Sequence, residues 1–464
     1  MITRPQASVY LILGPALAIA TYYLCYLSFG FESVAAITAA ITVLTVTWWV
    51  TEALPIPITS LLPFALLPLF NVVGHREVSA AFGSHVILLL MGAFMLSKSL
   101  EKAGVHKRLA IIMINAIGSN SKKRLVLGFM IATAVLSMWI SNTATVLIML
   151  PIALAVLASV EERPLKVALI LGIAYAASVG GVGTLIGTPP NVIFAGLYEQ
   201  QSGQEFGFVT WMMVGIPCVI IAIPMMAIWL TRHLSGPLQV NLPTLGPWQS
   251  EEIRTLSVFG LAVLAWITRN APFGGWSELF GVNGAGDSTV ALAAVIVMFI
   301  VPNGKGSRLL DWETAVAIPW GMLLLFAGGI ALATGFTASG LSTLIGDGLS
   351  RFTEFPLLIT LLLLCLSVTY LTEITSNTAT ATLLMPILYL VGINYGVDPA
   401  IFMIPAAMAA SCAFMLPVAT APNAIAYGTG EIDIKDMVKE GAVLSFGVSS
   451  MLALVCYVVL DIAL

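Results

Sequence analysis

The chain has 464 residues, of which 59% are hydrophobic and only 9% are charged, and its formal net charge is −4. Soluble domains carry roughly a quarter charged residues, so this composition excludes a soluble globular protein and indicates an all-α polytopic membrane protein. No basic face is available for nucleic acid, and we expect no such partner. The expected surroundings are the lipid bilayer of the cell (inner) membrane, crossed several times.

The first apolar stretch runs from about Val9 to Phe29 and is long enough to cross a bilayer. No small-residue cleavage site ends it, so we expect a retained transmembrane helix. Windows of about 20 residues give further candidate spans at roughly 33–51, 58–74, 125–140, 145–161, 165–186, 209–231, 255–269, 286–302, 356–375, 379–394, 400–416 and 441–463. If the pieces around a repeated pentapeptide, described below, are halves of one interrupted helix, about eleven spans result.

Two further apolar runs contain small residues midway. Residues 83–104 are interrupted at Gly92 and Ala93, and residues 319–340 are interrupted at Ala327, Gly328 and Gly329. We predict that these runs form a pair of re-entrant helical hairpins, one in each half of the chain. The alternative is two ordinary spanning helices whose glycines lie at packing contacts.

The distribution of lysine and arginine predicts the orientation. Basic residues crowd one segment and are opposed only by Glu101; they are Lys98, Lys102, Lys107, Arg108, Lys122, Lys123 and Arg124. The positive-inside rule places this segment in the cytoplasm. Within it, residues 109–117 are apolar enough to lie along the interface as an amphipathic helix. Residues 192–231 contain no basic residue, so we expect the loop near residue 200 outside.

The pentapeptide Ser-Asn-Thr-Ala-Thr occurs twice, at Ser141–Thr145 and at Ser376–Thr380, 235 residues apart. Both copies lie in apolar surroundings, and a proline follows each serine by ten residues (Pro151 and Pro386). Such a polar, poorly helix-forming segment is tolerated in lipid only where it lines a site. Two copies in matching halves predict a transporter built from inverted repeats, whose broken helices meet at a central substrate site.

A second pair of motifs follows the pentapeptides. Thr188-Pro189-Pro190-Asn191 comes after an Ala-Ala-Ser at 176–178, and Thr420-Ala421-Pro422-Asn423 comes after an Ala-Ala-Ser at 409–411. The elements therefore keep one order in both halves. The alternative for Pro189, Pro190 and Pro422 is that they only kink their helices; kinks at these places would still open backbone groups toward a site.

Hydroxyls, amides and exposed backbone carry the chemistry of these motifs, because none of them contains lysine or arginine. An interrupted helix exposes N–H groups that attract anions and C=O groups that suit cations such as Na⁺. Asn142 and Asn377 offer both an oxygen and an amide donor. An anionic substrate without an arginine partner needs co-bound cations, which predicts ion coupling. The alternative for one isolated copy is a helix cap or an interhelical hydrogen bond.

Glu373 lies three residues before Ser376 in an otherwise apolar stretch, and Met138 occupies the matching position in the first half. An intramembrane carboxylate is a candidate functional group. Glu373 is therefore a candidate ion-coupling carboxylate, near a cation site or carrying a proton. The alternative is a structural carboxylate that is hydrogen-bonded to the opposing hairpin.

The motifs together resemble the divalent anion/sodium symporter family, which includes bacterial dicarboxylate carriers and mammalian citrate and sulfate cotransporters. The resemblance covers nearly the whole chain. It rests on WVTEALPIPITSLLP at 49–63, both Ser-Asn-Thr-Ala-Thr motifs, GTLIGTPPN at 183–191 and ASCAFMLPVATAPNAI at 410–425.

The resemblance implies an 11-helix fold with two hairpins, a homodimer, and an elevator movement of a transport domain against a dimerising scaffold. The implied division is a first transmembrane helix at 1–32, a first repeat at 33–235 and a second repeat at 236–464. The scaffold would comprise 33–78 and 254–310, the transport part 79–205 and 311–430, and the last helix 441–463.

The resemblance also implies site residues. A first Na⁺ site would use Ser141, Asn142 and the backbone around Gly187, and a second would use Thr372, Asn377 and the backbone near Ala419. The substrate carboxylates would contact Asn142, Thr143, Thr188, Asn377, Thr378 and Thr420. Thr188 stands where other members carry serine, and Ala421 where some carry a second proline, so the resemblance does not fix the choice of substrate.

The function expected from these features is Na⁺ symport of a C4-type dicarboxylate such as succinate, malate or fumarate. Transport of sulfate or citrate and Na⁺-independent dicarboxylate exchange remain open. A remote alternative is an intramembrane serine hydrolase with Ser141 or Ser376 as nucleophile, which would need a base within hydrogen-bond reach. No histidine lies in a neighbouring apolar segment, so we expect a transporter and no enzyme.

Overall fold

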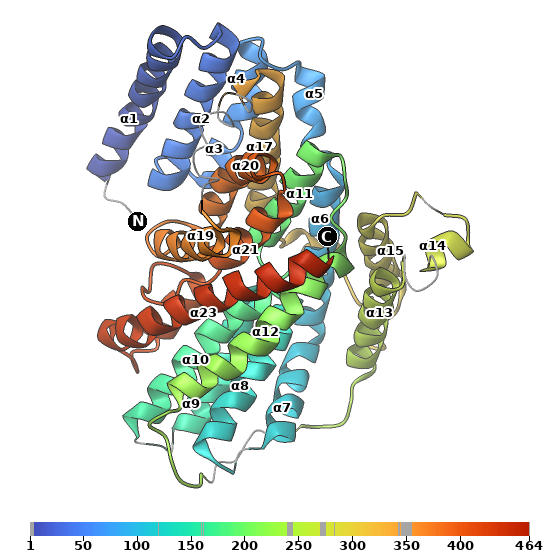
Figure 1. Cartoon of the computed structure of the whole chain (residues 1–464). Helices are drawn as coiled ribbons and strands as arrows, with labels where there is room; N and C mark the ends of the chain where they lie inside the picture. The colour runs from blue at the N-terminus through green and yellow to red at the C-terminus, as the bar shows by residue number, and fades with distance from the viewer. Residues whose placement is uncertain are drawn as a thin grey trace.

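The computed structural model of the chain describes residues 4–118, 120–158, 160, 162–238, 245–269, 275–282, 284–341, 344 and 355–463 (Figure 1). These residues form helices and no β-strand, which confirms the all-α prediction. Eight helices in the described part are long and apolar enough to cross a membrane, and five shorter segments are also apolar. The polytopic character predicted from composition is therefore present in the fold.

The N-terminal segment contains the helix predicted at 9–29, which packs against its successor. Only 11% of the apolar window of this first helix is buried within the chain, so most of its surface is available to lipid. The helices of this segment are α1 (Arg4–Tyr23), the π-helical η1 (Leu24–Ser28), α2 (Ser33–Thr51), α3 (Ile56–Thr59) and α4 (Leu62–Leu69).

The two runs predicted to be re-entrant hairpins are single helices, so that prediction is wrong. After α5 (His75–Ala80), they form α6 (His85–Ala103) and α17 (Trp320–Ala338). Their glycines lie at close packing contacts: a Cβ on Gly92 would lie 2.8 Å from Ala291 Cβ, and one on Gly328 would lie 2.6 Å from Ser60 O. The small residues therefore allow neighbouring helices to pack closely and do not break the helices that contain them. This is the packing role that the alternative interpretation of the sequence predicted.

Each half does contain a helical hairpin, and the pentapeptide lies at its tip. In the first half α8 (Lys122–Ser137) and α9 (Asn142–Leu157) flank the turn. Lys122 Nζ, at the start of α8, lies 2.6 Å from the carboxylate of Glu162, beyond the end of α9. A single collinear helix over these 40 residues would separate the two groups by about 60 Å at 1.5 Å per residue. The prediction of an interrupted helix around the pentapeptide is therefore wrong.

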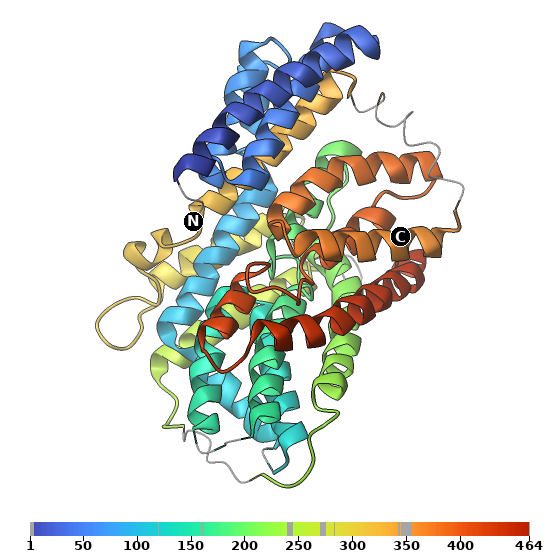
Figure 2. The ribbon, with the colours of Figure 1, turned by 90° about the vertical axis from the view of Figure 1, so that its left-hand side faces the viewer.

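The second hairpin consists of α19 (Leu357–Thr372) and α20 (Asn377–Tyr395), the orange pair in Figure 2. Its ends also meet, because the Tyr395 hydroxyl donates to Phe355 O at 2.9 Å and lies 2.8 Å from Thr360 Oγ1. The first hairpin starts in the basic segment at Lys122, and its other end meets that start through Glu162, whereas residues 355–400 contain no lysine or arginine. The positive-inside rule thus gives the hairpins opposite orientations, as inverted repeats require.

The proline motifs interrupt two other helices. The breaks separate α10 (Arg163–Gly181) from α11 (Pro189–Ser202), and α21 (Ala400–Ala410) from α22 (Ala421–Gly428). Proline stands within the first two positions of α11 and of α22, where its missing N–H costs no helical hydrogen bond. Each motif therefore separates two helices, and the break leaves backbone groups outside the helical hydrogen-bond pattern.

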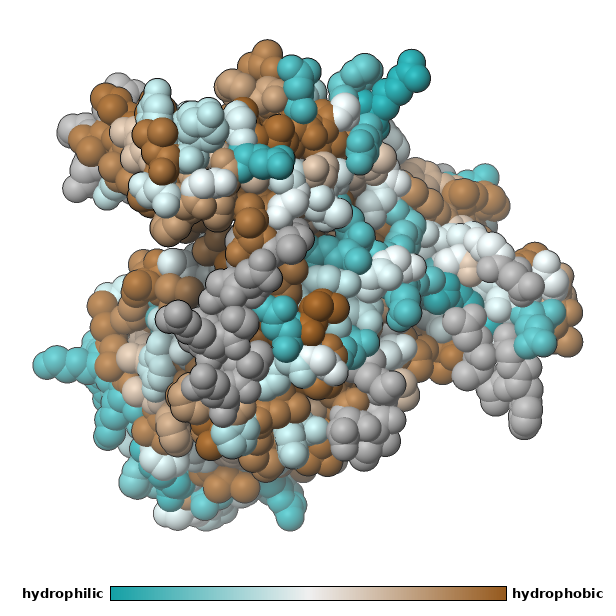
Figure 3. Space-filling view, turned by 45° about the horizontal axis from the view of Figure 1, so that its top comes forward, coloured by the Kyte–Doolittle hydropathy of each residue, from teal (hydrophilic) through white to brown (hydrophobic). Residues whose placement is uncertain are grey.

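The helices pack in two groups (Figure 1). In the group that we call the frame (α1–α6 and α13–α17), α6 packs against α13, α15 and α16, and α17 packs against α3 and α4. In the group that we call the core bundle (α7–α12 and α19–α23), α10 packs against α8, α9 and α12, and α23 packs against α12, α19 and α21. The remaining bounds are α7 (Val105–Ile117), α12 (Phe208–Leu230), α13 (Ser250–Ile267), α14 (Gly275–Leu279), α15 (Asp287–Ile300), α16 (Trp312–Val316) and α23 (Ile434–Ala463). Brown hydrophobic residues cover much of the face in Figure 3, as lipid contact requires.

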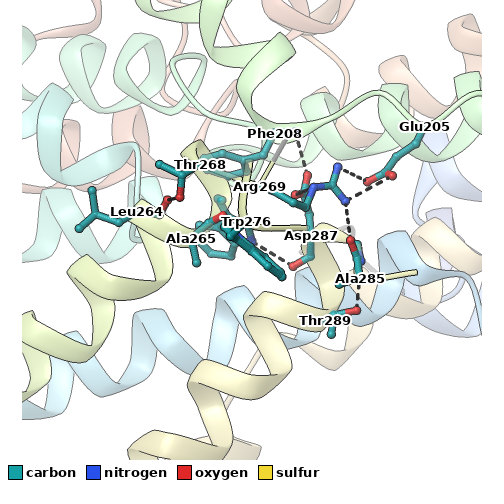
Figure 4. Close-up of polar contacts among 12 residues, drawn as sticks. Glu205, Phe208, Leu264, Ala265, Thr268, Arg269, Trp276, Ala285, Asp287 and Thr289 are labelled. Carbon is teal, nitrogen blue, oxygen red and sulfur yellow. Dashed lines mark hydrogen bonds and ion pairs between the residues drawn. The ribbon is translucent and has the colours of Figure 1, made fainter. Parts of the chain in front are cut away.

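A polar cluster joins the frame to the core bundle at the predicted outer side (Figure 4). Arg269 of the frame is 7% exposed; its Nη2 lies 3.1 Å from Glu205 Oε1 and its Nε lies 3.2 Å from Asp287 Oδ1. Asp287 Oδ2 accepts a hydrogen bond of 2.8 Å from Phe208 N, at the start of α12. The guanidinium thus bridges a carboxylate of each group.

Candidate functional site

The two hairpin tips and the two helix breaks meet at one cavity of about 700 Å³. Its lining includes these residues predicted from the sequence: Ser141, Asn142, Thr143, Gly187, Thr188, Asn377, Thr378, Ala419 and Thr420. Thr372 and Glu373 do not line it; both are buried beneath the tip of the second hairpin, at 0% and 3% exposure. Segments that lie 235 residues apart in the chain are therefore brought together.

Oxygen atoms gather around Asn142 at the first hairpin tip. Ser137 Oγ lies 2.7 Å from the Asn142 amide and donates to Ala177 O at 2.7 Å. With its nitrogen turned inward, the amide donates to Ala177 O at 3.2 Å and to Gly187 O at 3.3 Å. With its oxygen turned inward, the same position offers an amide, a hydroxyl and two backbone oxygens. Such a set suits a hard cation, which binds oxygen ligands.

The second hairpin tip repeats this arrangement around Asn377. Thr372 Oγ1 lies 2.7 Å from Asn377 Oδ1 and 3.1 Å from Ala410 O. Ser137 and Thr372 stand 235 residues apart, the spacing of the two pentapeptides. Ser137 is missing from the site predicted by resemblance, although this offset would have identified it as the counterpart of Thr372.

Two glycines make the first arrangement sterically accessible. A Cβ on Gly187 would lie 2.4 Å from Gly181 O, and one on Gly181 would lie 2.8 Å from Asn142 Oδ1. Cβ atoms essentially never approach other atoms so closely. The backbone on both sides of the first break therefore reaches Asn142 only because both residues lack a side chain.

The asparagines of the proline motifs brace the two breaks. Asn191 Nδ2 donates to Gly181 O at 3.0 Å and to Thr184 O at 2.8 Å. Asn423 Nδ2 donates to Ala413 O at 3.1 Å and to Leu416 O at 3.0 Å. In both repeats the acceptors lie ten and seven residues before the asparagine. The sequence marked these asparagines as part of a motif but gave them no role.

Four helix N-termini open onto the cavity, those of α9, α11, α20 and α22. The first N–H groups of a helix have no intrahelical partner, and its N-terminus carries partial positive charge. Asn142 and Thr143 supply such N–H groups at one tip, and Asn377 and Thr378 supply them at the other. At α11, Pro189 and Pro190 supply none, so that helix contributes its dipole and the Thr188 hydroxyl. Convergent helix N-termini are suited to an anion.

The charged residues of the lining lie at one end of the cavity. Among the described lining residues, Lys98 is the single cation, and its Nζ lies 2.6 Å from Glu101 Oε2. Lys98 and Glu101 lie in the last two turns of α6, and Glu52 follows α2, at the side that the basic residues place in the cytoplasm. The lining described here contains no histidine, so neither Ser141 nor Ser376 has a histidine base beside it.

Comparison with known proteins gives consistent results. Residues 46–396 match the citrate transporter family CitMHS. The chain is 42% identical over 456 residues to the sodium-dependent dicarboxylate transporter SdcS of Staphylococcus saprophyticus, covering 93% of this chain and 87% of that protein. It is 40% identical over 450 residues to SdcS of Staphylococcus aureus, covering 92% and 86% of the two chains.

Two solved structures share the fold. The YdaH transporter of Alcanivorax borkumensis matches with a TM-score of 0.61 at 15% identity, covering 83% of this chain and 87% of that one. MtrF of Neisseria gonorrhoeae, described as one of a class of antimetabolite efflux pumps, matches with a TM-score of 0.61 at 13% identity, covering 89% and 96%. At these identities the likeness concerns the fold alone.

Proposed function

We propose, from the premise that this chain belongs to the citrate transporter and divalent anion/sodium symporter family, that it imports C4-type dicarboxylates by Na⁺ symport. The substrates would be succinate, malate or fumarate. Na⁺ is the coupling ion, bound near Asn142 and Asn377. The substrate carboxylates are held between the hairpin tips and the two threonines, Thr188 and Thr420.

One observation carries the proposal: four helix N-termini and two oxygen-lined positions face one cavity that has no unpaired positive side chain among its described lining residues. A dianion placed there needs charge compensation beyond the helix dipoles. Two cations next to the asparagines would supply it. The relatives named sodium-dependent dicarboxylate transporters support the same assignment.

The test is uptake of labelled succinate into proteoliposomes that contain the purified protein, with and without an inward Na⁺ gradient. We expect uptake that requires Na⁺ and that excess unlabelled malate and fumarate suppress. Undiminished uptake without Na⁺ would overturn symport in favour of exchange. Stronger suppression by sulfate or citrate than by malate would reassign the substrate within the family.

We propose that transport proceeds by an elevator movement of the core bundle against the frame, in a homodimer whose contacts lie in the frame. The packing supports placing α6 and α17 with the frame, although the sequence-based division assigned residues 79–205 and 311–430 to the transport part. The cavity mouth, next to Glu52 and Glu101, corresponds to an inward-facing state. The Arg269 cluster then holds the opposite, outer side closed.

Glu205→Gln is expected to reduce the ratio of inward-facing to outward-facing protein by about twofold to fivefold, the value of a partly exposed ion pair. The variant removes the Glu205 charge that pairs with Arg269 across the two groups and leaves the Arg269–Asp287 pair in place. A Val418→Cys reporter measures the population, because Val418 lines the cavity and is 83% exposed. The five native cysteines are buried and give little background.

Labelling of the reporter from the cytoplasmic side with a membrane-impermeant thiol reagent should slow in Glu205→Gln. Glu278→Gln is the matched control, because Glu278 is an exposed carboxylate of α14. Equal labelling rates in the parent and in Glu205→Gln would contradict the proposal that the Arg269 cluster holds the frame and the core bundle together on the outer side.

A further inference from the structure

Glu373 is the one predicted site residue that the proposed mechanism leaves without a task. Its Oε1 accepts hydrogen bonds from Phe414 N at 2.7 Å and Met415 N at 2.9 Å, and its Oε2 accepts from Met415 N and Leu416 N, both at 3.0 Å. The Ser445 hydroxyl adds a weaker contact of 3.4 Å to Oε1. Backbone N–H groups donate and cannot accept, so this arrangement holds both carboxylate oxygens as acceptors.

These N–H groups would otherwise continue a helix. In an α-helix they would bond to the carbonyls four residues earlier, those of residues 410–412. The α21 helix instead ends at Ala410, and Ala410 O accepts from Thr372 Oγ1 at 3.1 Å, beside Asn377. The carboxylate thus substitutes for the helical acceptors and leaves a carbonyl available at the second oxygen-lined position.

The first repeat brings backbone oxygens to its asparagine without a carboxylate. Its matching helix, α10, continues to Gly181, and Met138 stands at the place of Glu373. There the close approach of Gly181 and Gly187 brings the backbone to Asn142. Ala413 and Ala419 stand at the matching positions of the second repeat, ten and four residues before Asn423, and their Cβ atoms prevent so close an approach. An unwound segment tied to a carboxylate replaces the missing glycines.

We propose that Glu373 is a positioning residue, which builds the second cation site by holding the backbone of residues 414–416 out of the helix and neither binds Na⁺ itself nor carries a proton. The donors surrounding both of its oxygens leave no room for a cation partner. The same backbone N–H groups fix the Glu373 carboxylate within the core bundle. This inference rests on the proposed Na⁺ symport.

Glu373→Gln should raise the Na⁺ concentration for half-maximal succinate uptake by about tenfold, because the amide nitrogen would face backbone N–H groups and leave donors unsatisfied. At saturating Na⁺ the KM for succinate should stay within about twofold of the parent, because hairpin and threonine contacts to substrate remain. Glu373→Asp keeps the charge and should restore part of the Na⁺ affinity, with an increase of about threefold. Glu431→Gln, which removes a carboxylate paired with Lys166 outside the cavity, is the matched control and should change neither constant.

The outcomes separate the alternatives. Uptake that stays absent in Glu373→Gln at every Na⁺ concentration, in protein that is monodisperse and melts like the parent, would overturn positioning in favour of a proton carrier or a direct ligand. Parent-like Na⁺ dependence in Glu373→Gln would overturn any role at the cation site. If Glu373→Gln does not fold, Glu373→Asp carries the same test. A parent protein that needs no Na⁺ would instead refute the proposed function itself.

Discussion

Replacement of Asn142 or Asn377 by alanine is expected to raise the Na⁺ concentration for half-maximal uptake by about tenfold or more. Each asparagine supplies the one side-chain amide oxygen at its position, next to the hydroxyl of Ser137 or Thr372 at 2.7 Å. Loss of a contact to a charged group costs about 1.5–3 kcal/mol, which corresponds to a factor of about 10 to 150 in affinity. Na⁺ titrations of succinate uptake in proteoliposomes measure the change.

Asn115→Ala is the matched control, because Asn115 is exposed on α7 and should leave the Na⁺ dependence unaltered. Each asparagine should also couple to its own hydroxyl partner. The double variant Asn142→Ala/Ser137→Ala should therefore cost less than the two single effects added together, whereas Asn142→Ala and Thr372→Ala should be nearly additive. Unchanged Na⁺ dependence in both asparagine variants would refute the assignment of the cation positions.

The sequence predicted the composition of the cavity well because repetition identifies residues independently of their distance in the chain. The twin pentapeptides and the twin proline motifs all line one cavity. Ser137 was not among the predicted site residues, because it lies outside the repeated pentapeptide and its counterpart is a threonine. The hydrogen-bond partners of Glu373 could not be predicted from the sequence for another reason. They are backbone N–H groups at residues 414–416, and a backbone group has no signature in the sequence.

The hairpins were predicted in the right number but at the wrong elements. A glycine within an apolar run has two meanings, a break in its own helix or a close contact with another helix. Gly92 and Gly328 have the second meaning, which depends on Ala291 and Ser60, residues remote in the sequence. The turns at residues 138–141 and 373–376, which end at the first serine of each pentapeptide, cannot be predicted from local sequence, because local sequence does not distinguish a reversal from a collinear break.

Gly187→Ala is expected to reduce Na⁺-dependent uptake to background. Its Cβ would lie 2.4 Å from Gly181 O and 2.9 Å from Gly181 Cα, so one of the two backbone segments must move. Gly181 cannot yield easily, because its own carbonyl accepts from Asn191 Nδ2 at 3.0 Å and it ends a buried helix. Any movement that relieves the contact carries Gly187 O away from Asn142 and dismantles the first cation position.

A binding measurement separates this local effect from misfolding. Na⁺ that binds only the native state raises the melting temperature of the purified protein by mass action. Gly187→Ala should therefore remain monodisperse. Its melting temperature should rise less with Na⁺ than that of the parent, because most of the contribution of the first cation position is lost. Gly428→Ala is the control, because a Cβ there meets nothing within 4 Å, and it should keep both uptake and the full rise. A folded Gly187→Ala with the Na⁺ affinity of the parent would mean that the backbone at this break does not form the cation position, and only the second position, beside Asn377 and Glu373, would then remain in the proposal.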